Sequence, residues 1–189
     1  MSVPRAGLDP TSVVAAGAQL ADEVGLAALT MGGLAERVGV RTPSLYKHVT
    51  GQDDLVRRIA ALALAESAAA IGTAVQGLAG RDALAAAAEA FRAYVLAHPG
   101  RYAATVGLEP AGPDDPLVDA GVRALAAFRA VLRGYDLPAP EEDHALRTLR
   151  SALHGFATLQ AARGFQWSAD VDESFGWMVD LLDRGLRRG

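Results

Sequence analysis

The stretch from residue 30 to residue 49 reads Thr-Met-Gly-Gly-Leu-Ala-Glu-Arg-Val-Gly-Val-Arg-Thr-Pro-Ser-Leu-Tyr-Lys-His-Val, a pattern of two short helices joined at Gly39. Glycine adopts a left-handed backbone at little cost, so Gly39 suits a tight turn between the helices. Small apolar side chains recur in both helices and predict a shared core, formed by Leu34, Ala35, Val38, Val40, Leu45 and Val49. The stretch therefore predicts a helix-turn-helix unit.

The second of these helices carries side chains that suit a DNA groove. A helix-turn-helix presents the first residues of its second helix to base edges in the major groove. The positive end of a helix also attracts phosphate. The expected DNA-binding residues are polar, short or basic: Arg41, Thr42, Pro43, Ser44, Tyr46, Lys47 and His48. The pattern alone leaves one alternative, namely two short helices of an ordinary bundle in which Tyr46 and His48 are half-buried and Pro43 only starts a helix.

Capping and helix-breaking residues extend the helical pattern to both sides of this unit. Asp9-Pro10 combines an N-cap with a proline at the first helical position, and Gly25 suits the end of that helix. Few segments alternate in the manner of strands. We therefore expect an all-α fold of about nine helices, over residues 10–25, 30–39, from 42, 52–72, 81–97, 101–106, 116–134, 141–163 and 171–188.

Composition sets limits on the class of protein. Hydrophobic residues make up 51% of the 189 residues, which predicts a globular chain. There is no cysteine, so disulfides and thiolate metal sites are excluded. No apolar run reaches the about 20 residues of a membrane span, and residues 1–8 have no apolar core typical of a signal peptide. We expect a soluble cytoplasmic protein.

Charge is distributed unevenly along the chain. The formal net charge is −4, which argues against a protein that coats DNA through many phosphate contacts. Residues 1–64 hold six basic and six acidic side chains, whereas residues 65–189 hold 12 basic and 16 acidic ones. An acidic body with a neutral N-terminal part can still bind DNA through one small basic face.

The last expected helix has apolar residues on two neighbouring faces. One stripe holds Phe175, Met178, Leu182 and Leu186, and the adjacent face holds Trp177 and Leu181. One face can cover the chain's own core and leave the other for a second chain, or one chain can wrap the helix on all sides. We expect a homodimer in which residues 141–163 and 171–188 form a four-helix bundle, with Leu149, Leu153, Phe156, Phe175, Met178 and Leu182 at the interface.

Aromatic and histidine side chains of the second half could line a small-molecule cavity. Small-molecule sites are mostly apolar with a few polar groups. The expected ligand-binding residues are Phe91, Tyr94, His98, Tyr102, Phe128 and His154. The alternative is that the aromatic residues are plain core and that His154 lies on a solvated or internally hydrogen-bonded helix face.

Catalytic and metal-binding patterns are missing from the sequence. The four histidines form neither a His-x-x-x-His pair nor a cluster with ligand spacing. A Gly-x-Ser-x-Gly motif, a phosphate loop and a dinucleotide fingerprint are likewise missing. We therefore expect no metal, no cofactor and no enzymatic activity. The alternative of an enzyme with a hydrophobic pocket would require a nucleophile–base pair or a metal site, and the sequence shows neither pattern.

The N-terminal pattern resembles the TetR family of transcriptional repressors. The matching elements run from residue 10 to about residue 60 and are Ala16, Leu20, Gly25, Leu29-Thr30, Leu34-Ala35, Val38-Gly39-Val40, Leu45-Tyr46-x-His48-Val49 and Leu55. The resemblance implies a three-helix DNA-binding domain (residues 1–51) and a ligand-binding and dimerisation domain (residues 52–189). It implies a regulator that leaves its operator when a small molecule binds. We expect the fourth helix to be the only covalent route between the two domains.

Within that resemblance, Arg41, Thr42, Pro43 and Ser44 fall at base-contacting positions, and Tyr46 and His48 fall at phosphate-contacting ones. Two departures remove possible phosphate contacts: Met31-Gly32-Gly33 at the start of the second helix, and Gln52 where many relatives have lysine. We therefore expect modest, salt-sensitive affinity. The same departures motivate an alternative, an all-helical binding or dimerisation protein whose N-terminal domain no longer binds DNA.

The second half resembles the TetR subgroup with a Trp-His-Gly signature. The matching stretches are Tyr94-Val-Leu-Ala-His98-Pro99-Gly100-x-Tyr102 and Leu153-His154-Gly155-Phe156. Leu153 stands where the subgroup has tryptophan. The effectors of this subgroup are diverse, so the resemblance predicts a small-molecule effector without naming it.

Overall fold

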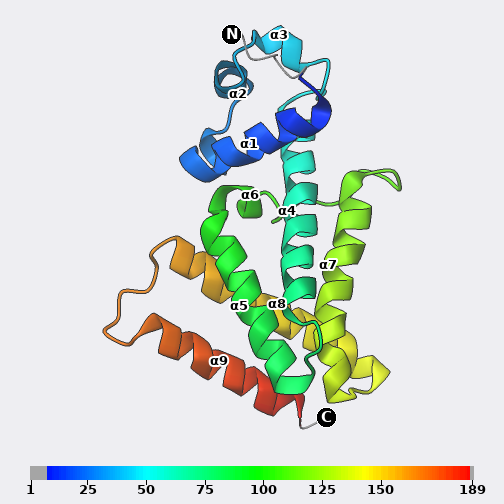
Figure 1. The fold of residues 1–189 in the computed structure, drawn as a ribbon, viewed down its shortest axis with the longest axis vertical. Helices are drawn as coiled ribbons and strands as arrows, with labels where there is room; N and C mark the ends of the chain where they lie inside the picture. Colours follow the sequence, from blue (N-terminus) through cyan, green and yellow to red (C-terminus); the bar gives the residue numbers. More distant parts are fainter. Residues whose placement is uncertain (1–7, 188–189) are drawn as a thin grey trace. The chain divides into compact units, whose positions relative to one another are not determined.

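The computed structural model describes residues 8–187, and all regular structure within that range is helical (Figure 1). The prediction of an all-helical fold with nine α-helices is confirmed for these residues. The helices are α1 (Pro10–Val24), α2 (Met31–Arg37), α3 (Thr42–Leu45), α4 (Gln52–Ala74), α5 (Gly80–Ala97), α6 (Pro99–Ala103), α7 (Pro116–Leu132), α8 (Ala139–Ala161) and α9 (Val171–Leu186). Two 3₁₀ turns, Leu26–Ala28 and Arg133–Tyr135, accompany them.

Most helix boundaries follow the predicted signals. Asp9 caps α1 by accepting a hydrogen bond from the backbone N–H of Ser12, and Gly25 follows α1 with φ of 85°. The short α6 differs, because it begins at Pro99 and not at Arg101. Proline is favoured at the first helical position, so Pro99 both follows one helix and starts the next. The expected end of the last helix at residue 188, and residues 1–7 of the stretch considered for a signal peptide, lie outside the described residues.

The chain folds into two compact units. The first unit holds the chain up to Ala63 together with Gly100–Val118, and the second holds Leu64–Pro99 and the chain from Asp119 onward. The first unit thus contains α1–α3, which we call the head, the first half of α4, and most of α6. The second contains the rest of α4, α5, most of α7, α8 and α9. The domain boundary expected between residues 51 and 52 stays a prediction.

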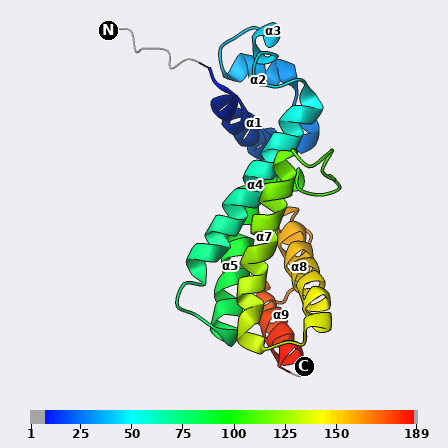
Figure 2. The same cartoon turned by 90° about the vertical axis from the view of Figure 1, so that its right-hand side faces the viewer.

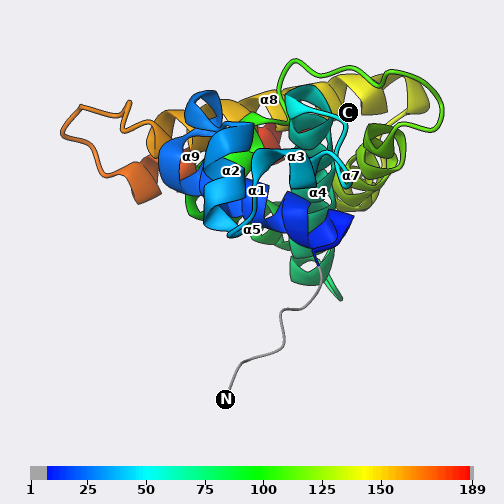
Figure 3. The ribbon, with the colours of Figure 1, turned by 90° about the horizontal axis from the view of Figure 1, so that it is seen from above.

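The core of the first unit is built around the helix-turn-helix. Leu34, Ala35, Leu45 and Val49 are buried as predicted, whereas Val38 and Val40 are only half-buried. The helices α2 and α3 contact each other, and Figure 3 shows them from above. In α1, Gly17 leaves space for α4, because an added Cβ would lie 3.0 Å from a methyl group of Leu55. The small glycine therefore lets α1 pack closely on α4.

The second unit is a helical bundle (Figure 2). Within it, α5 packs against both α8 and α9. Its core is aliphatic and aromatic, and includes Leu84, Phe91, Val95, Val131, Leu149 and Leu153. At one end of the bundle Gly134 touches the start of α5, since an added Cβ would lie 2.3 Å from the backbone nitrogen of Gly80. Backbone contact of this kind fixes the turn after α7 against α5.

Membrane-spanning helices and clusters of metal-binding side chains are both missing from residues 8–187. None of these helices combines the length and the apolar character that a bilayer-spanning helix requires. Within the same range, no three His, Cys, Asp or Glu side chains are grouped as metal ligands would be.

Candidate nucleic-acid interface and ligand domain

A capping threonine, a glycine and backbone hydrogen bonds shape α2 and the turn that leads to α3. Thr30 caps α2, its Oγ1 accepting from the backbone N–H of Gly33 at 3.1 Å. Gly39 has φ of 70°, the left-handed conformation expected there, and the N–H of Val40 donates to the carbonyl of Ala35 at 3.0 Å. The turn between the helices is therefore closed by backbone hydrogen bonds, and only the capping and glycine positions need particular residues.

The first residues of α3 and the turn that follows it separate into an inner and an outer side. Leu45 and Val49 are buried. The seven predicted DNA-binding residues all retain solvent exposure: Arg41, Pro43, Tyr46 and Lys47 are exposed, and Thr42, Ser44 and His48 are half-buried. Tyr46 is 54% exposed, which excludes the half-buried alternative for its side chain. The outer side thus carries mostly polar side chains and one aromatic ring.

Ion pairing separates the basic residues of the first unit into two classes. Arg37 pairs with Glu23, and Arg58 pairs with Asp54 four residues earlier in α4. In contrast, among the described residues neither Arg41 nor Lys47 forms an ion pair within the chain. The two cations beside α3 are therefore available for an external anion.

Gln52 has a structural partner that the sequence did not reveal. Its side-chain Nε2 donates to the carbonyl of Leu29 at 2.6 Å, which ties the start of α4 to the residue just before the Thr30 cap. Gly33 is also constrained, because an added Cβ would lie 3.3 Å from the Thr30 hydroxyl. Two positions where phosphate contacts were considered lost thus contribute to the packing and capping of the head.

The residues predicted to bind a ligand fall into pairs and single positions. Phe91 and Phe128 are buried and meet edge to face, with ring centroids 5.8 Å apart. Tyr94 donates its hydroxyl to Glu66 at 2.8 Å, and its ring centroid lies 5.1 Å from that of His98. These pairs belong to the second unit, so the structure brings four of the six predicted residues together two by two.

The other two predicted ligand-binding residues lie elsewhere. Tyr102 is buried in the first unit. His154 is half-buried in α8, and its backbone carbonyl accepts the hydroxyl of Thr158 at 2.7 Å. Burial lowers the pKa of the His154 imidazole, and the positive charge of Arg150 acts in the same direction. Both effects favour the neutral form of the imidazole.

Three of the six residues predicted for the dimer interface are buried within the single chain. These are Leu149, Leu153 and Phe175, so their side chains offer a partner almost no surface. Phe156 lies in an internal aromatic cluster, with ring centroids 4.7 Å from Phe165 and 5.0 Å from Phe175. In the stripe predicted on α9, Phe175 is thus buried in the protomer's own core, whereas Met178, Leu182 and Leu186 are half-buried.

A buried arginine that sequence reasoning missed organises this aromatic cluster. Arg92 of α5 lies over the ring of Phe175, with its guanidinium carbon 4.6 Å from the centroid. It donates to the side chain of Gln160 at 2.7 Å and pairs with Asp172. Because α5, α8 and α9 each contribute to this arrangement, Arg92 fixes the α8–α9 hairpin on α5.

Exposed apolar side chains lie on the opposite faces of the same two helices. Leu159 of α8 is 52% exposed, and Trp177 and Leu181 of α9 are 64% and 48% exposed. Gly155 and Gly185 lie in these helices with open space where a side chain would be. Small residues and exposed apolar ones together describe a surface that another helix could approach closely.

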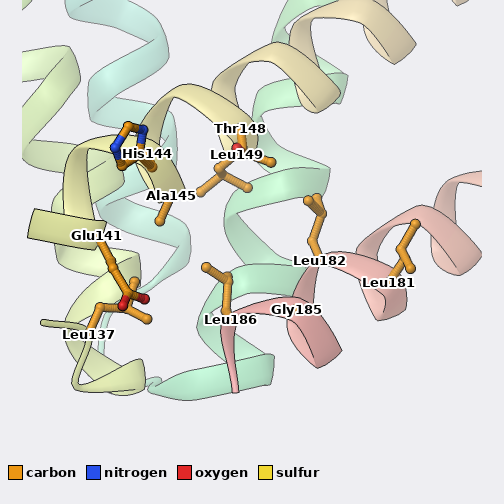
Figure 4. A pocket seen from close by; sticks show the side chains of 10 residues that line it. All are labelled: Leu137, Glu141, His144, Ala145, Thr148, Leu149, Leu181, Leu182, Gly185 and Leu186. Atoms are coloured by element: carbon orange, nitrogen blue, oxygen red, sulfur yellow. The ribbon is translucent and has the colours of Figure 1, made fainter. Parts of the chain in front are cut away.

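A groove of about 490 Å³ continues this surface between the start of α8 and the end of α9 (Figure 4). Its lining is mostly apolar, with polar groups on the α8 side. The lining residues are Leu137, Glu141, His144, Ala145, Thr148, Leu149, Leu181, Leu182, Gly185 and Leu186. Two of them, Leu149 and Leu182, belong to the predicted interface. Among the other lining residues, Leu181 and Leu186 could have been predicted, because they are apolar residues near the end of α9.

Comparison with known proteins identifies the family. Residues 13–59 match the family model described as "Bacterial regulatory proteins, tetR family". Residues 84–182 match a second model, "Tetracyclin repressor-like, C-terminal domain". The chain belongs to the TetR family. The resemblance seen in residues 10–60 is therefore confirmed, and the family is one of DNA-binding helix-turn-helix regulators and not of enzymes.

Similar proteins support this membership over the whole length. The chain is 36% identical over 189 residues to the uncharacterized HTH-type transcriptional regulator Rv0681 of Mycobacterium tuberculosis, covering 99% of this chain and 86% of that protein. It is 30% identical to the uncharacterized HTH-type transcriptional regulator YobS of Bacillus subtilis, covering 97% of this chain and 95% of that protein. Among solved structures, a TetR variant from Acinetobacter baumannii AYE, in complex with minocycline, superposes with a TM-score of 0.73 at 26% identity, covering 96% of this chain and 98% of that one.

Proposed function

We propose that this TetR-family regulator is a cytoplasmic repressor that binds operator DNA as a homodimer and leaves it when a small molecule binds its C-terminal domain. The observation that carries the proposal is the outer surface of α3. There, polar residues and two cations that form no ion pair with any described residue lie opposite the buried Leu45 and Val49. A helix with its apolar side anchored and its cationic side open has the form required for a DNA groove.

Within this proposal the outer residues divide their tasks. Arg41, Thr42, Pro43 and Ser44 lie at the start of α3 and would read base edges. Tyr46, Lys47 and His48 follow in the next turn and would contact phosphate. Only a few phosphate contacts are available, since Arg37 and Arg58 are neutralised within the chain. Affinity would therefore be modest and sensitive to salt.

Dimerisation would use the outer faces of α8 and α9. A two-fold interface is self-complementary, so one surface must supply both the exposed apolar residues and the space that receives them. The α8–α9 surface offers both, since Trp177 and Leu181 are exposed next to the groove. Four helices would then pack as a bundle, and the two α3 helices would have to lie about 34–36 Å apart to reach successive major grooves.

An effector site in the second unit is the remaining part of the proposal. Phe91, Phe128, Tyr94 and His98, which meet in two ring pairs, would supply an apolar wall with a few polar groups, as small-molecule sites usually have. The TetR variant of Acinetobacter baumannii, 26% identical, is solved with minocycline, which supports a small-molecule effector in general but not its identity. We also propose the Trp-His-Gly subgroup, on the basis of residues 94–102 and 153–156.

Selection of bound duplexes from a random DNA pool tests DNA binding and requires no operator sequence in advance. We expect the wild-type chain to enrich a palindromic sequence. The double variant Arg41→Ala/Lys47→Ala should lose binding to it. Arg129→Ala is the matched control, since it removes an exposed arginine of α7 and should bind as the wild type does.

Two outcomes would contradict the proposal. If no sequence is enriched, the head does not read DNA, and the alternative of a binding or dimerisation protein gains. If the double variant binds as tightly as the control, then the surface of α3 is not the one that contacts DNA.

A further inference from the structure

The α8–α9 hairpin lies wholly within the second unit. The chain passes between the two units at residues 63–64, 99–100 and 118–119, all of them before the hairpin begins. The expectation that the fourth helix is the only covalent route between the two domains is therefore wrong. The outer surface of the hairpin belongs to one unit alone.

Three residues at intervals of four lie along the outer face of α9: Trp177, Leu181 and Gly185. Residues four apart lie one above the other on a helix, so these three form one ridge. Trp177 is 64% exposed, Leu181 is 48% exposed, and an added Cβ at Gly185 would meet nothing within 4 Å. Side-chain size thus falls along the ridge from an indole to a hydrogen atom, with Leu181 at the middle.

The two ends of the hairpin differ in shape. The end next to the α8–α9 loop protrudes, because Leu159 of α8 and Trp177 of α9 are both more than half exposed. The other end is hollow, since the groove of about 490 Å³ lies between the start of α8 and the last turns of α9 (Figure 4). Leu181 and Gly185 both line this groove. The same surface therefore carries a protrusion at one end and a hollow at the other.

A two-fold axis at Leu181 matches these two ends to each other. In an isologous interface, a residue i that contacts j of the second copy is repeated by j contacting i. An axis perpendicular to α9 at Leu181 makes the two α9 helices antiparallel and brings Trp177 level with the partner's Gly185. Parallel helices would instead place the two Trp177 side chains against each other and leave both grooves empty.

The lining of the groove is complementary to an indole. Leu149, Leu182 and Leu186 supply aliphatic contacts for the apolar body of the ring. Glu141 and Thr148 carry acceptor oxygens on the α8 side. A tryptophan that becomes covered usually finds an acceptor for its N–H. Apolar and polar lining residues thus occur in the combination that a tryptophan side chain requires.

We propose that Trp177 and Gly185 select the partner of this chain: the indole of Trp177 enters the groove beside the partner's Gly185, twice per dimer, about a two-fold axis at Leu181. The inference rests on the proposed homodimer and names the contacts that a second copy must offer. A chain of the same fold with a large residue at position 185 would clash with the indole, and one with a small residue at position 177 would leave the groove empty. The pair therefore favours a second copy of this chain over other proteins of the same fold.

Analytical ultracentrifugation of the full chain and of three variants tests the pairing. Trp177→Ala removes the indole, and Gly185→Trp places a second indole opposite the first. Each should raise the dimer dissociation constant at least about ten-fold. The double variant Trp177→Ala/Gly185→Trp again joins one large and one small residue at each contact, so it should regain most of the wild-type affinity. Circular dichroism should show each chain folded, because both positions are exposed.

Mixtures of variants test partner selection directly. Equimolar Trp177→Ala and Gly185→Trp chains should form a heterodimer tighter than either homodimer, because each contact then joins one tryptophan and one small residue. The double variant should pair with itself but not with the wild type, since that combination joins two tryptophans at one contact and two small residues at the other. Native mass spectrometry distinguishes these species when one chain carries a tag.

Two substitutions of the same chemistry lie off the ridge and serve as matched controls. Trp167→Ala removes a tryptophan that is 80% exposed in the loop before α9. Gly176→Trp adds a tryptophan on α9, at a position where an added Cβ would meet nothing within 4 Å. Residue 176 lies about 140° around the helix from Leu181. Neither control should change the dissociation constant.

Cysteine cross-linking tests the position of the axis, and the chain is suited to it because it contains no cysteine. Leu181→Cys should give a disulfide-linked dimer on mild oxidation, since a residue on the axis meets its own copy. Trp177→Cys alone should not, because its two copies would lie about 12 Å apart along the helices, beyond the Cα separation of about 4.4–6.8 Å that a disulfide allows. Trp177→Cys/Gly185→Cys should cross-link again.

Several outcomes overturn the pairing while the proposed homodimer stands. One is a wild-type dimer that the single variants weaken no more than the controls do. Another is a double variant as weak as the single variants, and a third is cross-linking of Trp177→Cys in place of Leu181→Cys. A wild-type chain that is monomeric at micromolar concentration contradicts the pairing and the proposed homodimer together. If Gly185→Trp fails to fold, Trp177→Ala and the cross-links decide.

Discussion

The head and the α8–α9 hairpin are both built from amphipathic helices, yet they separate their residues differently. Around α3 the apolar residues Leu45 and Val49 turn inward, and the outer residues are polar or cationic. In α9 both sides are apolar: Phe175 and Val179 are buried, while Trp177 and Leu181 remain exposed. The surface proposed to bind DNA can therefore be recognised from residue type alone. The surface proposed to bind a second copy can be recognised only once the protomer's own core is known.

The largest effect should come from placing a charge on either side of the α8–α9 hairpin. Leu153→Asp buries a carboxylate among core residues and should lower the free energy of unfolding by about 4 kcal/mol or more. Leu181→Asp lies on the exposed side and should leave the protomer folded while weakening the dimer by about a hundred-fold. Urea unfolding and light scattering separate the two effects.

The control for that pair is Leu125→Asp in α7, which replaces a leucine of similar exposure, 42%, outside the hairpin. It should change neither folding nor association. A Leu181→Asp chain that stays dimeric at micromolar concentration would show that the exposed side is not the interface.

In the head, substitutions of Arg41 and Lys47 should affect DNA binding in different ways. If Arg41 reads a base, Arg41→Ala should cost about 1–3 kcal/mol on the selected duplex and relax preference at one position. If Lys47 contacts phosphate, Lys47→Ala should weaken all duplexes alike and reduce the salt slope by about one unit. Titrations on selected and random duplexes at several salt concentrations measure both. If both variants lost the same affinity on the selected and on the random duplexes, base reading by Arg41 and phosphate contact by Lys47 would be contradicted.

The end of the hairpin should show a moderate pH effect. Burial opposes ionisation of Asp183, but hydrogen bonds from Tyr135 and Arg187 outweigh it, so the pKa of the carboxyl is lowered from its ordinary 3.8. A lowered pKa adds stability above the unfolded-state value, and that stability is lost as the pH falls through the folded-state value. Asp183→Asn should thus destabilise at pH 7 by about 1–3 kcal/mol and have less effect at the acid end.

Asp180→Asn provides the comparison for this prediction. Asp180 pairs with Arg81 at 2.6 Å, but both side chains are nearly half exposed, so the substitution should have little effect at either pH. Urea unfolding curves from pH 7 down to pH 3 measure both variants. An Asp183→Asn chain whose stability falls with acid as steeply as the wild type would contradict the role given to this carboxylate.

The smallest effect should come from Gln52. Gln52→Ala removes the hydrogen bond to Leu29 and should destabilise the head by about 1 kcal/mol. Gln52→Lys should lose the same bond but add a cation at the start of α4. If that cation reaches phosphate, the salt slope of DNA binding should increase by about one unit. A slope equal to that of Gln52→Ala would mean that this position does not face the DNA.

Sequence reasoning predicted the helices because their signals are local. Asp9, Pro10 and Gly25 act on their own neighbours, and the structure uses each of them as expected. Periodicity is less decisive in α7. Leu125 lies one helical turn before the buried Phe128, and yet it is 42% exposed. A helix with more apolar residues than its core requires does not reveal which side is buried.

The candidate sites also differ in whether their signals are local in the sequence. The outer residues of α3 could be predicted, since burial and residue type agree within one short segment. The ion pair in which Arg101 Nε donates to the Asp22 carboxylate at 2.8 Å could not be predicted, because these residues are 79 positions apart and no period connects them. Arg92 was missed for the same reason, as its partners Gln160 and Asp172 come from distant helices. Contacts between elements need the fold before their chemistry can be recognised.

Gly100 has a consequence for directed evolution of this protein. Alanine favours a helix over glycine by about 1 kcal/mol, so propensity alone would rank Gly100→Ala as an improvement. The packing of Gly100 reverses that ranking. An added Cβ would lie 1.8 Å from the carbonyl oxygen of Ala21, so the methyl group would separate α6 from α1. A screen for heat-resistant chains would therefore reject this substitution. At this one position, a ranking by helix propensity and a ranking by packing would therefore give opposite answers.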